Sequence, residues 1–453
     1  MNLPNYFLAD LPPEATLTPA MIAEACQTLK RNREQYLARR STESLVNVLS
    51  NVAEHWLQPE YPFRQLALEQ GPAATGFSRP TLANGLDSFF RQLTRENLHA
   101  LLAQELGHAH RLDELAATSA ETNNQRAAMV HGPEFLMHIA AGNIPNPALT
   151  SMVLGLLARS AQFVKCASRT SLLPRLFAHS IYDAEPKLGA CLEIAEWRGG
   201  EAALEQAVFN EADCVTVTGS DETLAAIRQR LPTKTRFLGC GHRVSFGYVT
   251  RDSLSGFDAK KIVANVASDV VAWDQRGCLS PHVMYVEHGG SVAAEQFAGM
   301  LAAELARREE SEPRGRLPVE LAANIASRRA FYEVRAAHSD ETRLWQSQGS
   351  TAWTVVYEAD AKFQLSCLNR FIYVKGVTDM VRTLQDADNV RGKVSTVGLA
   401  APETKARELA AQLARWGVSR VCPLGQMQNP PLTWRQDGRP GLGDLVTWTD
   451  WER

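Results

Sequence analysis

The sequence predicts an α/β protein made of two parallel-sheet units and a helical N-terminal lead-in. Three observations support this prediction. Short apolar strands alternate with helical runs from Glu134 onward, the alternation restarts near Arg243, and residues 13–130 are polar with helical amphipathicity. With 453 residues, the chain is also too long for one ordinary core.

The lead-in is expected to be mostly helical. Its helix-like runs are residues 19–39, 42–58 and 95–117. They carry no catalytic constellation, so we interpret them as elements that pack on a later domain or on an oligomer interface.

The first sheet unit is predicted from four apolar runs separated by helical ones. These runs are residues 135–140, 162–165, 191–197 and 214–218. In a parallel sheet, ligands bind beyond the carboxyl ends of the strands. Asn143, Lys165 and Ser220 all fall at such ends.

The second unit begins with a strand at residues 244–249 and a helix at 258–273. A polar loop around Cys278 precedes a strand at 282–287, and helices are expected at 291–307 and 319–336. Residues 422–453 are rich in Pro, Gly and Trp and are expected to be loop-like.

Composition and charge narrow the class of protein. The formal net charge is only -3, with acids and bases interspersed, which does not indicate a nucleic-acid partner. The first twelve residues lack the features of a signal peptide, and the most apolar stretch, 152–164, is broken by Arg159 and too short for a membrane span. We therefore expect a cytoplasmic protein whose eight scattered cysteines are mostly reduced and buried.

Cys278 is the candidate nucleophile. It lies in a polar loop after Gln275-Arg276-Gly277, where a nearby arginine and exposed backbone N–H groups favour a thiolate. From these residues alone, an ordinary loop cysteine remains the alternative.

Three further sites have a functional and a purely structural interpretation. The amide of Asn143 can donate to an oxyanion or simply form a tight turn. Lys165 can bind a ribose or phosphate or be a solvated surface residue. Gly219-Ser220 can receive a pyrophosphate at a helix N-terminus or act as a plain N-cap.

A zinc site is the remaining alternative for this region. Cys240-x-His242 and Cys278-x-x-x-His282 could form a Cys2His2 set, but their spacings are atypical of structural zinc. The sequence therefore predicts no metal site.

Taken in order, several segments resemble the aldehyde dehydrogenase superfamily, and within it the LuxC-type long-chain fatty acid reductases that act on acyl thioesters. The segments are Ala141–Pro145, Lys165–Ser168, Val217–Ser220, Gly241–Gly247, Asp274–His282, Leu368–Arg370 and Trp434–Arg439. Their order and spacing carry the resemblance: Lys165 follows Asn143 by 22 residues, and Cys278 follows Gly219 by 59.

The resemblance implies an aldehyde-dehydrogenase-like fold with a Rossmann-type cofactor domain at residues 1–243, a catalytic domain at 244–421 and a return segment at 422–453. It also implies reduction of an acyl thioester to an aldehyde. Cys278 would attack the thioester, Asn143 and the Cys278 N–H would hold the oxyanion, and hydride transfer would produce a thiohemiacetal that collapses to the aldehyde. The acyl donor would be an acyl-CoA, an acyl-carrier protein or an acylated protein partner, and a homo-oligomer is expected.

For the cofactor, the resemblance implies that Lys165 binds the adenosine ribose and that Gly219 and Ser220 bind the pyrophosphate. Relatives that prefer NAD place a glutamate three residues after the lysine, whereas this chain has Ser168 followed by Arg169. This difference favours NADPH, with NADH as the alternative.

Two other departures bear on function. Phe237 and Leu238 stand where acid-forming aldehyde dehydrogenases carry a glutamate base, which argues against aldehyde oxidation, the alternative function. His242 could act as a base in place of that glutamate.

The tail has Arg435-Gln436 where this branch would have histidines. A further alternative function, a non-catalytic subunit that binds acylated partners, is disfavoured because Cys278, Asn143 and Lys165 are intact.

Overall fold

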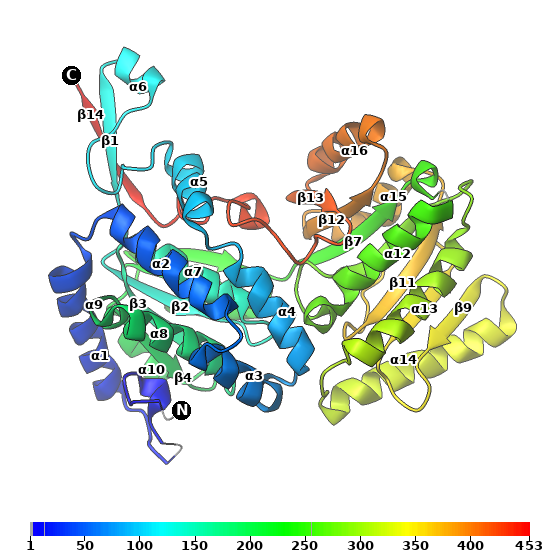
Figure 1. Cartoon of the computed structure of the whole chain (residues 1–453), viewed down its shortest axis with the longest axis horizontal. Helices are drawn as coiled ribbons and strands as arrows, with labels where there is room; N and C mark the ends of the chain where they lie inside the picture. Colours follow the sequence, from blue (N-terminus) through cyan, green and yellow to red (C-terminus); the bar gives the residue numbers. More distant parts are fainter. Residues whose placement is uncertain (1–2, 13, 255) are drawn as a thin grey trace. The chain divides into compact units, whose positions relative to one another are not determined.

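The computed structural model describes residues 3–12, 14–254 and 256–453. The chain divides into two compact units (Figure 1). The first contains residues 1–75, 86–241 and 431–453, and the second contains residues 76–85 and 242–430. These bounds differ from the predicted domains in three places: residues 76–85 belong to the second unit, that unit begins at His242 rather than at Val244, and the return segment begins at Pro431 rather than at Cys422.

The lead-in is helical, as predicted. Its helices are α1 (Pro19–Asn32), α2 (Thr42–Leu57), α3 (Pro62–Thr75), α4 (Arg79–Phe90), α5 (Arg95–Leu106) and α6 (Ser119–Asn123). The prediction missed α3 and α4 and extended the fifth helix to residue 117. That helix ends earlier because Gly107 adopts a left-handed C-cap, with φ of 72°.

The first unit is built around a five-stranded parallel sheet in the order β4-β3-β2-β5-β6. The strands are β2 (Phe135–Ile139), β3 (Ala161–Cys166), β4 (Leu192–Glu196), β5 (Cys214–Thr218) and β6 (Arg236–Cys240). The connecting helices are α7 (Asn146–Leu157), α8 (Leu172–Ala184), α9 (Pro186–Gly189), α10 (Ala202–Phe209) and α11 (Asp221–Arg230). The predicted alternation of strands and helices is therefore confirmed, with β6 as an additional strand.

Helices cover both faces of this sheet. One face packs against α10, α11 and α1, whose buried Ile22, Cys26 and Leu29 recur at helical spacing. The lead-in thus supplies part of the core of the first unit, consistent with its interpretation as a packing element.

A two-stranded antiparallel ribbon completes the first unit. β1 (Arg126–His131) pairs with β14 (Thr447–Glu452), so that Arg126 lies opposite Glu452 (Figure 1). The expectation of a wholly loop-like tail was therefore wrong. The tail contains a strand because it finds a partner that lies more than 300 residues earlier in the chain.

The second unit contains a seven-stranded sheet in the order β13-β12-β7-β8-β11-β10-β9, parallel except for β9. The strands are β7 (Val244–Val249), β8 (Pro281–Glu287), β9 (Thr342–Gln346), β10 (Thr354–Glu358), β11 (Phe371–Val377), β12 (Val394–Ala400) and β13 (Arg420–Pro423). Helices α12 (Gly256–Val271) and α13 (Ala294–Ser311) pack on one face, and α14 (Val319–His338), α15 (Met380–Asp386) and α16 (Glu403–Trp416) pack on the other. Among the residues described, no helix is both long and apolar enough to cross a membrane.

Candidate functional site

Asn143, Lys165 and Ser220 lie along the carboxyl edge of the first sheet. Asn143 follows β2, Lys165 is near the end of β3, and Ser220 follows β5. Ile139, the last residue of β2, pairs with Lys165 on one side and with Val217 on the other. The strand order reverses between β2 and β5, and ligands of open α/β sheets bind at such reversals.

Lys165 is a buried cation at this edge. Its side chain is 4% exposed and its Nζ lies 5.8 Å from the centroid of the Trp197 ring. Nζ has no hydrogen-bond partner among the described residues. Burial lowers the pKa of Lys165, an effect opposed by Glu205, Cys166 and Glu196. Desolvation of a largely buried ammonium group is costly, and groups with such shifted pKa values are common in ligand sites.

The turn after β3 presents Ser168 and Arg169 to solvent. Arg169 has a left-handed backbone, with φ of 65°, and its N–H donates to Glu196 Oε1 at 2.5 Å. The Ser171 N–H donates to the other oxygen of Glu196 at 3.1 Å. Glu196, at the end of β4, therefore fixes this turn. This role was not predicted from the sequence, although an acidic residue at the end of a predicted strand could have indicated it.

Ser220 caps helix α11. Its Oγ accepts a hydrogen bond from the Thr223 N–H at 3.2 Å, so the N-cap interpretation describes the geometry. Asp221 and Glu222 occupy the first turn, where negative charge opposes a bound anion. Pyrophosphate binding by Gly219 and Ser220 therefore stays a prediction.

In the second unit, Cys278 lies between a sharp backbone kink and strand β8. The preceding residues Trp273, Asp274 and Gln275 all have left-handed φ values, of 52°, 49° and 61°. For residues other than glycine, this conformation costs about 1–2 kcal/mol each. Surrounding contacts must therefore hold this kink in place.

Those contacts come from Arg370, just before β11, and from backbone carbonyls of β8 and β11. Arg370 is 1% exposed, and its Nε donates to Asp274 Oδ1 at 2.9 Å. Gln275 Nε2 donates to the carbonyls of Pro281 and Phe371, at 2.8 and 2.9 Å. The kink is thus anchored to β8 and β11, and Asp274 and Arg370 form a buried ion pair.

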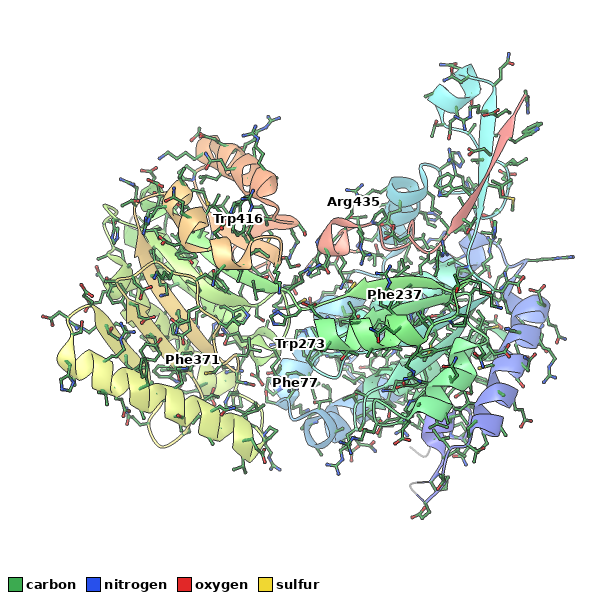
Figure 2. All side chains as sticks on the ribbon, turned by 180° about the vertical axis from the view of Figure 1, so that it is seen from behind. Phe77, Phe237, Trp273, Phe371, Trp416 and Arg435 are labelled. Atoms are coloured by element: carbon green, nitrogen blue, oxygen red, sulfur yellow. The ribbon has the colours of Figure 1, made fainter. Side chains whose placement is uncertain are left out.

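Cys278 itself is half-buried. Its carbonyl oxygen accepts from Ser245 Oγ at 2.8 Å. Arg276, which was expected to favour a thiolate, places its guanidinium 4.5 Å from the centroid of the Phe77 ring, and burial lowers the pKa of this arginine. Phe77 also packs edge-on against Trp273, at 5.2 Å between ring centroids (Figure 2).

Two histidines lie at the same amino edge of the second sheet. His242 precedes β7 and is exposed, whereas His282 begins β8 and is buried. Burial and the charge of His242 lower the pKa of His282 to about 4. The Ser366 N–H donates to Nδ1 of His282 at 3.1 Å, so the neutral ring carries its proton on Nε2. Among the residues that the structure describes, no group of three His, Cys, Asp or Glu side chains could hold a metal ion.

The position expected for a glutamate base lies on β6. Phe237 and Leu238 are half-buried there, with the Arg228 guanidinium 5.9 Å from the Phe237 ring (Figure 2). β6 as a whole reads Arg-Phe-Leu-Gly-Cys and carries no carboxylate.

Comparison with known proteins decides the family. A family model described as acyl-CoA reductase (LuxC) matches residues 37–448, most of the chain. The chain belongs to the LuxC family.

Relatives and solved structures agree with this assignment. The chain is 23% identical over 419 residues to a long-chain acyl-protein thioester reductase of Aliivibrio fischeri, covering 90% of this chain and 82% of that protein. It is 23% identical over 440 residues to long-chain acyl-protein thioester reductase 2 of Photobacterium leiognathi, covering 95% and 85%.

Among solved structures, bifunctional proline utilization A (PutA) matches with a TM-score of 0.73 and 17% identity, over 98% of this chain but only 45% of PutA. The Delta-pyrroline-5-carboxylate dehydrogenase of Mycobacterium tuberculosis matches with a TM-score of 0.68 and 14% identity, over 96% and 83%. At these identities the structures show the aldehyde dehydrogenase fold, as the resemblance implied.

The C-terminal segment of this LuxC-family chain is fixed to the first unit. The carboxylate of Glu105 accepts from the N–H groups of Gly441, Leu442 and Gly443, at 3.0, 2.5 and 3.0 Å. Arg439 donates to the Gly239 carbonyl at 2.8 Å. The segment therefore contacts the end of β6. It carries Arg435 (Figure 2) and Gln436 at the positions where histidines were expected.

Proposed function

We propose that this chain reduces an acyl thioester to an aldehyde through a covalent acyl intermediate on Cys278. The observation that carries the proposal is the LuxC-family match over residues 37–448. The anchored loop that holds a half-buried Cys278 supports it. Oxidation of aldehydes, the alternative within this fold, is disfavoured because β6 lacks a carboxylate.

The first chemical step needs only groups of the protein and the thioester. The Cys278 thiolate attacks the carbonyl carbon and a new C–S bond forms. The original C–S bond breaks, and the donor leaves as a thiolate with its electron pair and takes up the proton that Cys278 lost. We assign to His242 the removal of the thiol proton, because His242 and Cys278 precede neighbouring strands, β7 and β8. The Asn143 amide is assigned to the oxyanion by resemblance to the superfamily.

The fit to a nicotinamide cofactor depends on the carboxyl edge of the first sheet. Lys165 is the largely buried cation at this edge, and its ammonium group would donate to a ribose hydroxyl or phosphate oxygen. Ser168 and Arg169 present a hydroxyl and a guanidinium at the next turn, and Gly219 and Ser220 stand where the pyrophosphate would bind. The reduced cofactor, when bound, supplies the hydride that turns the acyl group into an aldehyde.

The preference between NADPH and NADH depends on opposing charges at the β3 turn. Arg169 would pair with a 2′-phosphate through a charge-assisted hydrogen bond. Glu196 carries the opposite charge, but both of its oxygens already accept backbone N–H groups of this turn. We therefore propose NADPH as the preferred cofactor.

Both proposals are tested by one assay. Purified protein is given a long-chain acyl-CoA, an acyl-carrier protein or an acylated protein, with NADPH or NADH, and the aldehyde is quantified. We expect aldehyde from at least one donor and a kcat/KM about 10-fold higher with NADPH, since Arg169 is exposed and its pairing is partly screened. Arg169→Ala should remove the preference. Absence of aldehyde from every donor overturns the function, and equal or better rates with NADH overturn the cofactor assignment.

We also propose that two copies of this chain associate through the β1-β14 ribbon. All six residues of β14 are exposed, including Trp448 and Trp451, each 42% exposed. An isolated two-stranded ribbon is marginally stable, and an open edge with large apolar side chains favours pairing with another chain.

Native mass spectrometry at micromolar concentration should therefore show an oligomer. The double variant Trp448→Ser and Trp451→Ser should shift it to the monomer, while Thr449→Ser on the same strand should not. A monomeric wild-type protein contradicts this proposal.

A further inference from the structure

Gly277, next to the nucleophile, is in contact with a residue from a distant loop. A Cβ at Gly277 would lie 2.9 Å from Gln428 Oε1 and 3.0 Å from its Nε2. Gly277 does not have a positive φ, so its backbone alone does not require glycine. A larger residue at position 277 would therefore have to displace the Gln428 amide.

Gln428 also contacts the other end of the same turn. Its side chain is buried, and Nε2 donates to Ser280 Oγ. The Ser280 N–H in turn donates to the Gly277 carbonyl at 3.0 Å. One amide group thus contacts both ends of the four-residue turn that contains Cys278.

The loop that carries Gln428 is held from two sides. Asp269 of α12 accepts from the N–H groups of Gly425 and Met427, at 2.6 and 2.9 Å. Arg420 of β13 donates to the carbonyls of Gln426 and Met427, both at 2.7 Å. Met427 is fully buried in the core. These contacts fix the backbone on either side of Gln428. The packing of the core therefore keeps the Gln428 side chain against the Cys278 turn.

We propose that Gln428 is a positioning residue for the nucleophile: it keeps the turn from Gly277 to Ser280 in the conformation in which Cys278 accepts an acyl group. The inference rests on the proposed role of Cys278. Gln428 is not assigned any contact with substrate or cofactor. Its effect should therefore appear in the rate of acylation and in kcat rather than in cofactor affinity.

The test measures acylation of Cys278 by a long-chain acyl-CoA without cofactor, using intact-mass and peptide mass spectrometry. Gln428→Ala should slow acylation about 10- to 100-fold, because small misplacements of a reacting group have effects of this size. The dissociation constant of NADPH should change less than about 2-fold, since that cofactor is assigned to the first unit. Gln426→Ala, in the same loop but with an exposed side chain, is the matched control and should acylate at the wild-type rate.

A second pair of variants tests the geometry. Gly277→Ala should push the amide away from Ser280 and cause a similar loss. The two changes break the same contact, so the double variant Gly277→Ala and Gln428→Ala should be about as slow as either single variant. If Gln428→Ala does not fold, Gln428→Met retains the bulk without the hydrogen bond and should show the same slow acylation.

The outcomes separate this inference from the proposed function. If wild-type protein forms no adduct on Cys278 with any donor, the proposed function fails. If wild type is acylated but the Gln428 variants match it, or if the Gly277 and Gln428 losses multiply, the positioning role of Gln428 is wrong.

Discussion

Cys278→Ala is expected to abolish aldehyde formation. This substitution removes the sulfur that we propose to form the acyl intermediate, and loss of a nucleophile can lower kcat by about 10,000-fold or more. Binding of NADPH, measured by fluorescence titration, should stay within about 2-fold of wild type. The residues assigned to the cofactor belong to the first unit, whereas Cys278 belongs to the second.

The control for this variant is Cys240→Ala. Of the other half-buried cysteines, Cys240 is the one closest to Cys278 in sequence. It should retain turnover and should still form the adduct on Cys278. If Cys278→Ala keeps near-normal turnover while Cys240→Ala loses it, the nucleophile has been assigned to the wrong cysteine.

The second large effect concerns the missing base. An aldehyde dehydrogenase that makes acids must hydrolyse its acyl-enzyme, and general-base help to water is worth roughly 100- to 10,000-fold. With Phe237 and Leu238 on β6, the thioester on Cys278 should react slowly with water. We therefore expect an acyl adduct that persists without cofactor and is discharged rapidly to aldehyde when NADPH is added.

This expectation is checked by following the adduct by mass spectrometry while free acid is assayed. Rapid release of carboxylic acid without cofactor would support the oxidative or hydrolytic alternative. His242, which is exposed before β7, is the candidate for a substitute base. A loss of acid release in His242→Gln would identify it as the base in that case.

Much of the fold could be predicted because its signals are local. The strands from Cys214 to Thr218 and from Val244 to Val249 were located to the residue, since apolar runs bounded by turn residues specify buried parallel strands. β6 was missed because all five of its residues are only half-buried, so it lacks such an apolar run. β14 was missed because only its pairing with β1 makes it a strand.

Part of the candidate site could also be predicted from local signals. Asn143, Lys165 and Ser220 were placed at one sheet edge by the rule that ligands bind beyond the carboxyl ends of parallel strands. The N-cap bond of Ser220 could be weighed in advance, because its partner is three residues away. The role of Glu196 could not, because it depends on β4 lying next to β3.

The sequence alone predicted which features carry the chemistry: a cysteine after Gln-Arg-Gly, a lysine at a strand end and a β6 segment without a carboxylate. Only the tertiary structure showed what holds them in place. Arg370 meets Asp274 from 96 residues away, and Gln428 reaches Ser280 from 148 residues away. Short-range patterns specify secondary structure and turns because they depend on neighbouring residues. Contacts between distant loops depend on the order in which strands assemble and on the packing of the core, which no local pattern contains.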